Sequence, residues 1–190
     1  MKKMSGKIIV IVAPSGSGKS TLITRLKKEF NELVESISFT TRPKRPGENE
    51  GKHYHFITVD EFKNKIKEND FLEWAEVHSN FYGTSKKFVQ DMLNSGKNIL
   101  FDLDTQGTDA LKKNFGDVAS SIFIAPPSIE ELEKRLKARG TESEQVIKRR
   151  IENAKREMLR QDDYDYKVLN NDLEEAYNQL SKLFKKILGQ

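Results

Sequence analysis

The feature that most constrains the fold is an apolar run that leads into a loop rich in glycine and serine, which in turn opens a helical pattern. Residues Lys7–Ala13 are apolar almost throughout and do not alternate with polar residues, which is typical of a strand covered on both faces. The loop P-S-G-S-G-K-S follows at 14–20, and a helical pattern covers 19–30. A buried strand that passes through a tight loop into a helix predicts an α/β fold with a largely parallel sheet.

The loop itself predicts a phosphate-binding site. It follows the pattern G-x-x-x-x-G-K-[ST], except that Ala13 stands at the first glycine and must therefore adopt a negative φ. Gly16 and Gly18 allow backbone N–H groups to turn inward around a phosphate, while Lys19 can bridge the β- and γ-phosphates and Ser20 can ligate Mg²⁺. The alternative is an ordinary glycine–serine turn, but the strand–loop–helix context favours nucleoside triphosphate binding. The predicted ATP-binding residues of this segment are Ala13, Pro14, Ser15, Gly16, Ser17, Gly18, Lys19, Ser20 and Thr21.

The rest of the chain continues the alternation of strands and helices, with two interruptions. Further strands are expected at Val34–Ser38, Asn98–Asp102, Ser120–Ala125 and Lys167–Leu169. The last helix, Leu173–Leu188, carries an apolar stripe that predicts core packing, formed by Leu173, Ala176, Tyr177, Leu180, Leu183, Phe184, Ile187 and Leu188. Residues 39–84 interrupt the alternation as an inserted lobe, and 127–150 as a charged pair of helices. Capping boxes are expected at Thr58/Glu61, Ser128/Glu131 and Thr141/Glu144.

Composition excludes several classes of protein. The 190 residues suit one compact domain, and the absence of cysteine excludes disulfide scaffolds, thiol catalysis and zinc–thiolate sites. The net charge is +4, but the signs are interspersed, which argues against a nucleic-acid-binding arm. The longest aliphatic run extends only from Ile8 to Ala13, whereas a membrane helix needs about 20 residues. We therefore expect a soluble, cytoplasmic protein without nucleic-acid or membrane partners; the pattern leaves its oligomeric state open.

A second basic segment, Phe39–Glu48, suggests another phosphate site. Its arginines, Arg42 and Arg45, lie three residues apart in a loop stiffened by Pro43 and Pro46. The planar guanidinium fork suits phosphate oxygens, so this loop could clamp a second phosphate. Taken alone, a solvated charged loop explains the same residues equally well.

Together with several further motifs, these segments resemble those of the guanylate kinase family. The segment T-T-R-P-K-R-P-G-E-x-x-G-x-x-Y-x-F is similar to the signature of that family, and F-L-E-W-A, Y-G-T, F-D-L-D-T-Q-G, I-A-P-P-S and R-L-K-A-R-G-T follow in order. The resemblance covers essentially the whole chain. It implies a three-layer P-loop core (1–37, 86–126 and 151–190), an inserted GMP-binding lobe (38–85) and a helical lid (127–150). It also implies the reaction of ATP with GMP to give ADP and GDP, with Mg²⁺.

The resemblance also implies roles for single residues. The GMP phosphate would contact Arg42, Arg45, Tyr54 and Tyr82, and the guanine edge would contact Ser38, Glu73 and Thr84, with Gly83 and Asp104 nearby. Asp102 would face the nucleotides and join Ser20 at the metal, while Asn170 and Asn171 would lie beside the adenine. The lid arginines that close on the transferred phosphoryl group would be Arg135, Arg139 and Arg150. Because Arg149 adjoins Arg150, the sequence does not decide which of the two points inward.

Several of these residues have structural interpretations when the resemblance is set aside. Arg135 and Arg139 share one helix face and would then be a solvated face, and Asp102 could be a helix cap or an ion-pair partner. His53 and His55 flank Tyr54, but with no third ligand a metal pair is not favoured. Aromatic residues of the lobe are expected to form its small core: Phe39, Phe56, Phe71, Trp74 and Phe81.

Three functions are compatible with the motifs. The first is a kinase that phosphorylates GMP, because phosphoryl transfer needs mainly positioning and charge neutralisation, and the sequence supplies a phosphate loop, a lysine and arginines. The second is a catalytically inactive module that binds phosphorylated peptides through Arg42 and Arg45, which leaves the intact loop unexplained. The third is a P-loop kinase with another acceptor, against which Ser38 and Glu73 argue. We favour the first.

Overall fold

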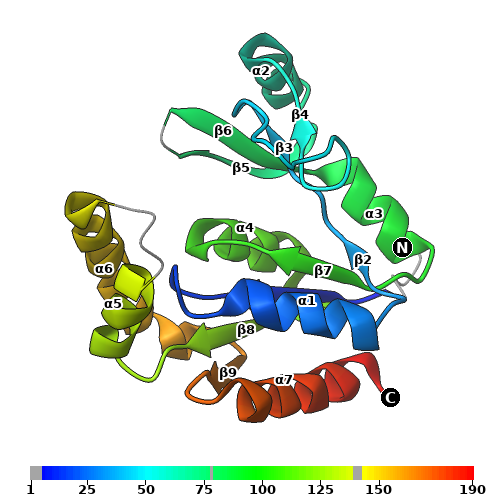
Figure 1. Ribbon diagram of the computed structural model, residues 1–190. Helices are drawn as coiled ribbons and strands as arrows, with labels where there is room; N and C mark the ends of the chain where they lie inside the picture. The colour runs from blue at the N-terminus through cyan, green and yellow to red at the C-terminus, as the bar shows by residue number, and fades with distance from the viewer. Residues whose placement is uncertain (1–5, 78, 139–142) are drawn as a thin grey trace. The chain divides into compact units, whose positions relative to one another are not determined.

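The computed structural model describes residues 6–77, 79–138 and 143–190. Its main sheet is five-stranded, parallel and ordered β2-β7-β1-β8-β9 (Figure 1). The strands are β1 (Ile8–Val12), β2 (Val34–Glu35), β7 (Ile99–Asp102), β8 (Ala119–Ala125) and β9 (Tyr166–Leu169). All five side chains of β1 are buried, as expected for a strand covered on both faces. The predicted α/β class with a parallel sheet is confirmed.

A second, four-stranded sheet is mixed and has the order β4-β3-β6-β5. Its strands are β3 (Phe39–Thr40), β4 (His55–Phe56), β5 (Phe71–Val77) and β6 (Asn80–Ser85). The strand expected at Val34–Ser38 is present but shorter than predicted, because only Val34 and Glu35 pair with β7, at Ile99 and Leu100. After Glu35 the chain leaves the main sheet and enters the small one at Phe39.

The chain divides into two compact units, one formed mainly by Leu33–Ala119 and the other by Ile9–Glu32 with Ser120–Gln190. The helices of the first unit are α2 (Val59–Lys67), α3 (Lys86–Asn94), α4 (Thr105–Phe115) and the 3₁₀ turn η1 (Gly116–Val118). Those of the second are α1 (Lys19–Glu29), α5 (Ile129–Ala138), α6 (Glu144–Leu159), α7 (Leu173–Leu188) and the 3₁₀ turn η2 (Gln161–Asp163).

In the first unit, α2 is held against the small sheet by stacked aromatic rings. The fully buried Phe62 of α2 stacks on Phe71 and on Phe81, with ring centroids 4.4 and 5.4 Å apart. A Cβ on Gly83 would lie 3.0 Å from both Phe62 and Phe71, so any larger residue there would require these rings to shift. The expected aromatic core is present, but its centre is Phe62, which the expected set did not include, and Trp74, which was expected in it, is 48% exposed. The Thr58/Glu61 capping box that begins α2 is confirmed.

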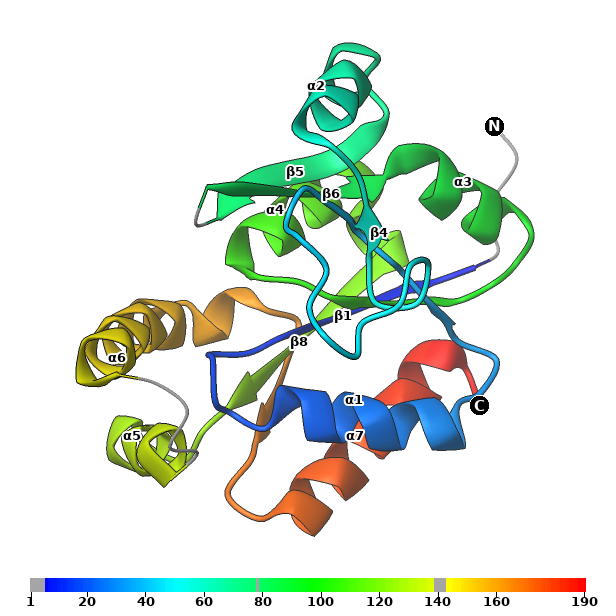
Figure 2. The same cartoon turned by 45° about the horizontal axis from the view of Figure 1, so that its top comes forward.

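In the second unit, α1 and α7 lie side by side (Figure 2). The predicted bounds of α7 are confirmed, and its buried residues include Ala176, Leu180, Phe184 and Ile187. Leu173 was expected in the buried stripe but is exposed, because it opens the first turn and the stripe begins one turn later at Ala176.

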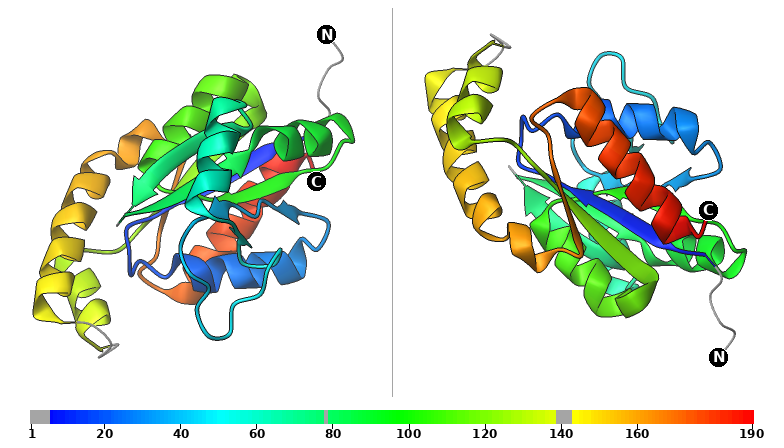
Figure 3. Two further views of the ribbon diagram at one scale, coloured as in Figure 1. Left: turned by 90° about the horizontal axis from the view of Figure 1, so that it is seen from above. Right: turned by 90° about the horizontal axis from the view of Figure 1, so that it is seen from below.

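The helices α5 and α6 pack side by side as well (Figure 3). They share an apolar cluster formed by Leu132, Leu136, Ile147, Ile151 and Ala154. The side chain of Ser128 accepts the N–H of Glu131 at 3.1 Å, the capping contact expected at the start of α5. The expected Thr141/Glu144 box lies outside the described residues, and the N-cap of α6 is Ser143. No helix in the described part of the chain is long and apolar enough to cross a membrane.

The contact between α1 and α7 includes a carboxylate that should make the unit sensitive to acid. Glu29 accepts hydrogen bonds from Ser181 Oγ at 2.8 Å and from Tyr177 Oη, and pairs with Lys185 Nζ at 2.8 Å. The contact with Lys185, followed by those with Tyr177 and Ser181, lowers the pKa of Glu29 from 4.5 to about 2. Because the ionised form is favoured in the folded state, this contribution to stability is complete above about pH 4.5 and is lost as the pH falls toward 2.

We therefore expect Glu29→Gln to lower the free energy of unfolding at pH 7 and to weaken its pH dependence between pH 5 and 2. Urea unfolding, followed at several pH values in that range, measures both effects. Glu68→Gln, an exposed glutamate at the end of α2, is the matched control. Parallel pH profiles for wild type and Glu29→Gln would contradict the expectation.

Candidate nucleotide-binding sites

The predicted phosphate loop joins β1 to α1 in the second unit. Gly16 and Gly18 have φ values of +93° and +90°, a conformation that favours glycine. Ala13 does not have a positive φ. This agrees with the expectation from the sequence, because its Cβ disfavours that conformation. Gly18 is the N-cap of α1 and has no side chain with which to cap the first N–H groups of the helix. These donors and the positive end of the helix dipole suit an anion.

Lys19 and Ser20 follow Gly18 as the first residues of α1. Lys19 is half-buried, whereas Ser20 and Thr21 are exposed. The side chain of Ser17, by contrast, is buried, and the residue is only 1% exposed. The loop thus presents Ser20 to solvent and turns Ser17 into the protein.

Two of the predicted lid arginines contact the loop or the residue that holds it. Arg150 Nη1 donates to Ser15 Oγ at 3.1 Å, and Arg149 is exposed. Both Nη groups of Arg135 donate to the backbone oxygen of Asn170 at 3.3 Å. Arg139, the third predicted lid arginine, lies outside the described residues. Of the arginine pair that the sequence left undecided, Arg150 is the one that contacts the phosphate loop.

The two predicted adenine-side residues differ in exposure. Asn171 is exposed, but Asn170 is buried and donates from Nδ2 to the backbone oxygen of Ser17 at 2.6 Å. The helix α5 also approaches the loop, since a Cβ on Gly16 would lie 3.0 Å from Leu132 and Leu136. The sequence did not indicate that Asn170 supports the phosphate loop.

In the first unit, a cavity of about 280 Å³ lies between the small sheet and the end of β7. Six of the nine predicted GMP-binding residues line it, together with Asp102, which was predicted at the metal. Its full lining is Ser38, Tyr54, Glu73, Ala75, Tyr82, Gly83, Asp102, Leu103 and Asp104. The other three predicted residues, Arg42, Arg45 and Thr84, lie outside this lining.

Glu73 is a half-buried acid that lines this cavity. Thr84, which is fully buried, donates its hydroxyl to Glu73 Oε1 at 2.6 Å. Burial raises the pKa of Glu73, and the charge of Asp104 raises it further, while the hydrogen bond from Thr84 acts in the opposite direction. A carboxyl group whose pKa is perturbed by burial and by a specific neighbour, and which lines a cavity, is a candidate ligand-binding residue. Thr84 orients Glu73 from within the small sheet.

Asp104 and Asp102 have different surroundings. Asp104 is the N-cap of α4, and its Oδ1 accepts the N–H of Gly107 at 2.8 Å. Asp102 is the exposed last residue of the otherwise buried β7. The cap assignment that the sequence offered for Asp102 therefore belongs to Asp104, two residues later.

Arg42 is held in place by several neighbours. Its Nη2 pairs with Glu48 Oε1 at 2.7 Å and its Nη1 donates to the backbone oxygen of Pro43 at 2.8 Å. The guanidinium also hydrogen-bonds Tyr82 and lies 5.5 Å from the ring centroid of Tyr54. The structure therefore brings together three of the four residues predicted for the GMP phosphate.

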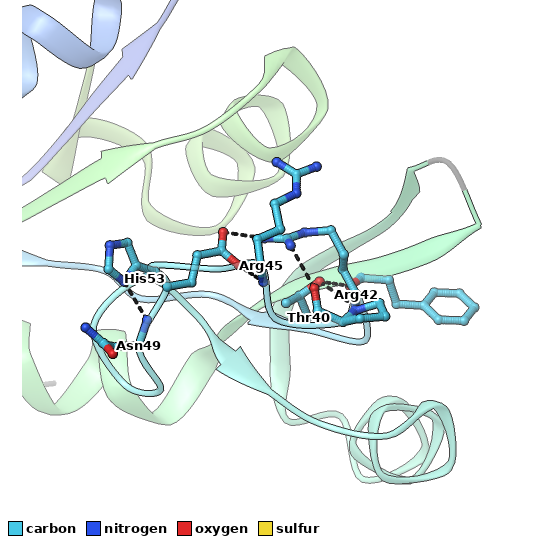
Figure 4. Close-up of polar contacts among 8 residues, drawn as sticks. Thr40, Arg42, Arg45, Asn49 and His53 are labelled. Atoms are coloured by element: carbon cyan, nitrogen blue, oxygen red, sulfur yellow. Dashed lines mark hydrogen bonds and ion pairs between the residues drawn. The ribbon is translucent and has the colours of Figure 1, made fainter. Parts of the chain in front are cut away.

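Arg45 differs from Arg42. It is exposed, and its side chain extends away from Thr40 in Figure 4. Its backbone N–H donates to Glu48 Oε2 at 2.8 Å, so Glu48 contacts both arginines. The hydrogen bond from Arg42, followed by that from the Arg45 backbone, lowers the pKa of Glu48 to about 2. Sequence reasoning missed Glu48, and its only signal was its place in the motif R-P-K-R-P-G-E.

The two histidines beside Tyr54 hold the turn between β3 and β4. His53 Nδ1 accepts the N–H of Asn49 at 2.9 Å (Figure 4), and His55 Nδ1 lies 3.0 Å from Glu50 Oε1. Among the described residues there is no group of three histidine, aspartate or glutamate side chains that could hold a metal ion by itself.

Almost the whole chain is similar to known proteins. The family model described as guanylate kinase matches residues 5–187. The guanylate kinase of Sulfurimonas denitrificans is 50% identical over 176 residues, covering 93% of this chain and 85% of that protein. That of Hydrogenovibrio crunogenus is 48% identical over 181 residues, covering 95% and 88%. The crystal structure of guanylate kinase from Anaplasma phagocytophilum superposes with a TM-score of 0.76 at 31% identity, covering 99% of this chain and 89% of that one. The chain belongs to the guanylate kinase family.

Proposed function

We propose that the chain transfers the γ-phosphoryl group of ATP to GMP and releases ADP and GDP. The observation that carries this proposal is the cavity of the first unit. It combines a half-buried carboxylate, Glu73, with the hydroxyl-bearing rings of Tyr54 and Tyr82, which adjoin the guanidinium of Arg42. A purine with hydrogen-bond donors on one edge and a phosphate at its other end matches that combination.

GMP provides these groups. Guanine presents N1–H and the exocyclic N2–H₂ on the same edge, and an ionised carboxylate, which only accepts, can take both. We assign this edge to Glu73, with Ser38, Gly83, Thr84 and Asp104 around it. The phosphate of GMP is assigned to Arg42, Arg45, Tyr54 and Tyr82.

ATP is assigned to the loop 13–21, with its phosphates on the N–H groups of the loop and on Lys19. Arg135, Arg139 and Arg150 would close on the transferred group, and Asn170 and Asn171 would lie on the adenine side. Mg²⁺ prefers oxygen ligands, and the exposed hydroxyl of Ser20 and the exposed carboxylate of Asp102 are of that kind. When bound with ATP, the ion would neutralise charge on the phosphates.

The chemistry needs no base or nucleophile from the protein. An oxygen of the GMP phosphate attacks the γ-phosphorus, the bond from that phosphorus to the β–γ bridging oxygen breaks, and ADP leaves. The residues contribute by positioning the two phosphates and by stabilising negative charge. We propose the division into core (1–37, 86–126 and 151–190), GMP-binding lobe (38–85) and lid (127–150) on the same grounds.

The proposed function is tested by a coupled assay of ADP release with ATP and, in turn, GMP, AMP, CMP and UMP. Turnover with GMP well above the others is the expected result. Turnover with another acceptor in preference to GMP would refute the assigned substrate. Absence of turnover with all four would instead favour a module that binds phosphorylated ligands through the arginine loop.

Replacing the loop arginines should damage the use of GMP far more than the binding of ATP. A charge-assisted hydrogen bond contributes about 1.5–3 kcal/mol, which is roughly 10- to 150-fold in affinity. We expect Arg42→Ala and Arg45→Ala each to raise the KM for GMP within this range. The effect of Arg42→Ala should be larger, because this change also leaves Glu48 without its partner.

The matched control is Lys44→Ala, which removes an exposed cation of the same loop and should leave both KM values near those of wild type. Measuring KM for GMP and for ATP on all three variants checks the assignment. If the arginine variants lost ATP affinity to the same extent, the assignment of this loop to GMP rather than to ATP would be wrong.

A further inference from the structure

Asn170 fixes the middle of the phosphate loop through one short hydrogen bond. Its Nδ2 donates to the backbone oxygen of Ser17 at 2.6 Å, across 153 residues of sequence. Asn170 is itself 4% exposed, and its own N–H donates to the backbone oxygen of Ala125 at 2.8 Å. The donor is therefore anchored on the main sheet, where Asn170 follows β9 and Ala125 ends β8.

This hydrogen bond determines the direction of a backbone donor that the loop needs. The described chain contains no cis peptide bond, and in a planar trans peptide the C=O and the following N–H point in opposite directions. When Asn170 holds the Ser17 oxygen, the N–H of Gly18 must point away from Asn170. This N–H belongs to the group that we assign to the phosphates of ATP.

The loop needs such an external anchor because of its own glycines. Gly16 and Gly18 flank Ser17, and both have φ near +90°. Glycine populates several backbone conformations with similar ease, so these residues allow the required turn without enforcing it. The fit is close, since a Cβ on Gly18 would lie 2.4 Å from Asn170 Nδ2.

The same residue also receives a lid arginine. The backbone oxygen of Asn170 accepts hydrogen bonds from both Nη groups of Arg135 at 3.3 Å. Arg135 is restrained further by Glu131, whose Oε1 lies 3.2 Å from its Nε. One residue thus contacts the phosphate loop with its side chain and a lid arginine with its backbone.

We propose that Asn170 is a positioning residue for triphosphate binding, which orients the Gly18 N–H through the Ser17 carbonyl. This inference deepens the proposed function and rests on its assignment of the loop to ATP. It gives Asn170 a role different from contact with adenine, because its side-chain amide is used on the loop.

The test is a set of isosteric substitutions. Asn170→Asp keeps the size of the side chain but replaces the donor by an acceptor facing the Ser17 oxygen. Asn114→Asp is the control for an amide that donates to a backbone carbonyl elsewhere, since Asn114 Nδ2 donates to Ala110 on the exposed face of α4. Asn170→Ala removes the donor without adding charge.

Calorimetric titration with ADP, ATP and GMP measures the effect on each nucleotide. We expect Asn170→Asp and Asn170→Ala to raise the Kd for ADP and ATP about tenfold or more, with the Kd for GMP unchanged. Asn114→Asp should have no effect. Unchanged ADP and ATP affinities in folded Asn170 variants would overturn the proposal.

A second measurement covers the case in which an Asn170 variant folds poorly. Asn170→Ser is a milder change that keeps a polar group but shortens its reach. In protein labelled at its 11 glycines, the Gly18 amide resonance should move on addition of ADP in wild type and move much less in Asn170→Ser. An equal shift in both proteins would refute the orienting role. If wild type fails to phosphorylate any nucleotide, the proposed function fails, while these binding data still decide the role of Asn170.

Discussion

Lys19→Ala is expected to abolish phosphoryl transfer while the protein remains folded. Lys19 is the first residue of α1, immediately after the N-cap Gly18, and we propose that its ammonium group contacts the β- and γ-phosphates of ATP. Loss of one preorganised group that stabilises transition-state charge costs about 10²- to 10³-fold in kcat, and we expect at least this loss. Alanine is a strong helix former, so α1 should persist.

The measurement is kcat in the coupled assay, together with circular dichroism and a melting curve for the variant. Lys28→Ala, which removes an exposed lysine from the last turn of the same helix, should retain wild-type turnover. Near-normal turnover in Lys19→Ala would show that the phosphate-loop assignment is wrong.

Glu73→Gln should remove most of the preference for GMP over AMP. The substitution keeps the size of the side chain, and the remaining carbonyl oxygen can still accept the hydroxyl of Thr84. Its amide group then presents donors to the N1–H and N2–H₂ of guanine, where the carboxylate presented an acceptor. A site built on such hydrogen bonds discriminates by about 10⁴-fold, because mismatched polar groups stay unpaired on burial.

We therefore expect kcat/KM for GMP to fall by about 10³-fold or more, while the KM for ATP changes little. Adenine has an unprotonated N1 and no amine at C2, so AMP should be much less affected and the GMP/AMP ratio should shrink. Glu76→Gln, the same substitution at an exposed position three residues further along β5, is the control. If Glu73→Gln retained wild-type kcat/KM with GMP, Glu73 could not be the residue that reads the guanine edge.

The features that depend only on neighbouring residues along the chain were predictable from the sequence. The phosphate loop was predictable because the turn, the glycines at positive φ and the helix start all lie within a few residues. The bounds of α7 were predictable for the same reason, since the helical period and Gly189 as its stop are local signals. The fold class followed from the order of these local elements.

Contacts between segments that the fold brings together were not predictable from local patterns. After Glu35 the chain passes from the main sheet to the small sheet. The pairing of β2 with β7 and of β3 with β6 sets this point, and no local sequence pattern predicts it. Glu48 is bound to Arg42 because a loop folds back on itself, and Thr84 donates to Glu73 because β5 and β6 pair in one register.

Asn170 is the clearest example of a role that could not be predicted from the sequence. From the sequence it is a polar residue after a strand, equivalent to Asn171, and the resemblance assigned both to the adenine side. In the folded chain one is buried against the phosphate loop and the other is exposed. Side-chain polarity is a property of the residue, but burial and hydrogen-bond partners depend on which segments the fold brings together. The place of the phosphate loop is therefore a local property that can be predicted from the sequence, whereas the residue that holds the loop depends on the packing of β9 beside β8.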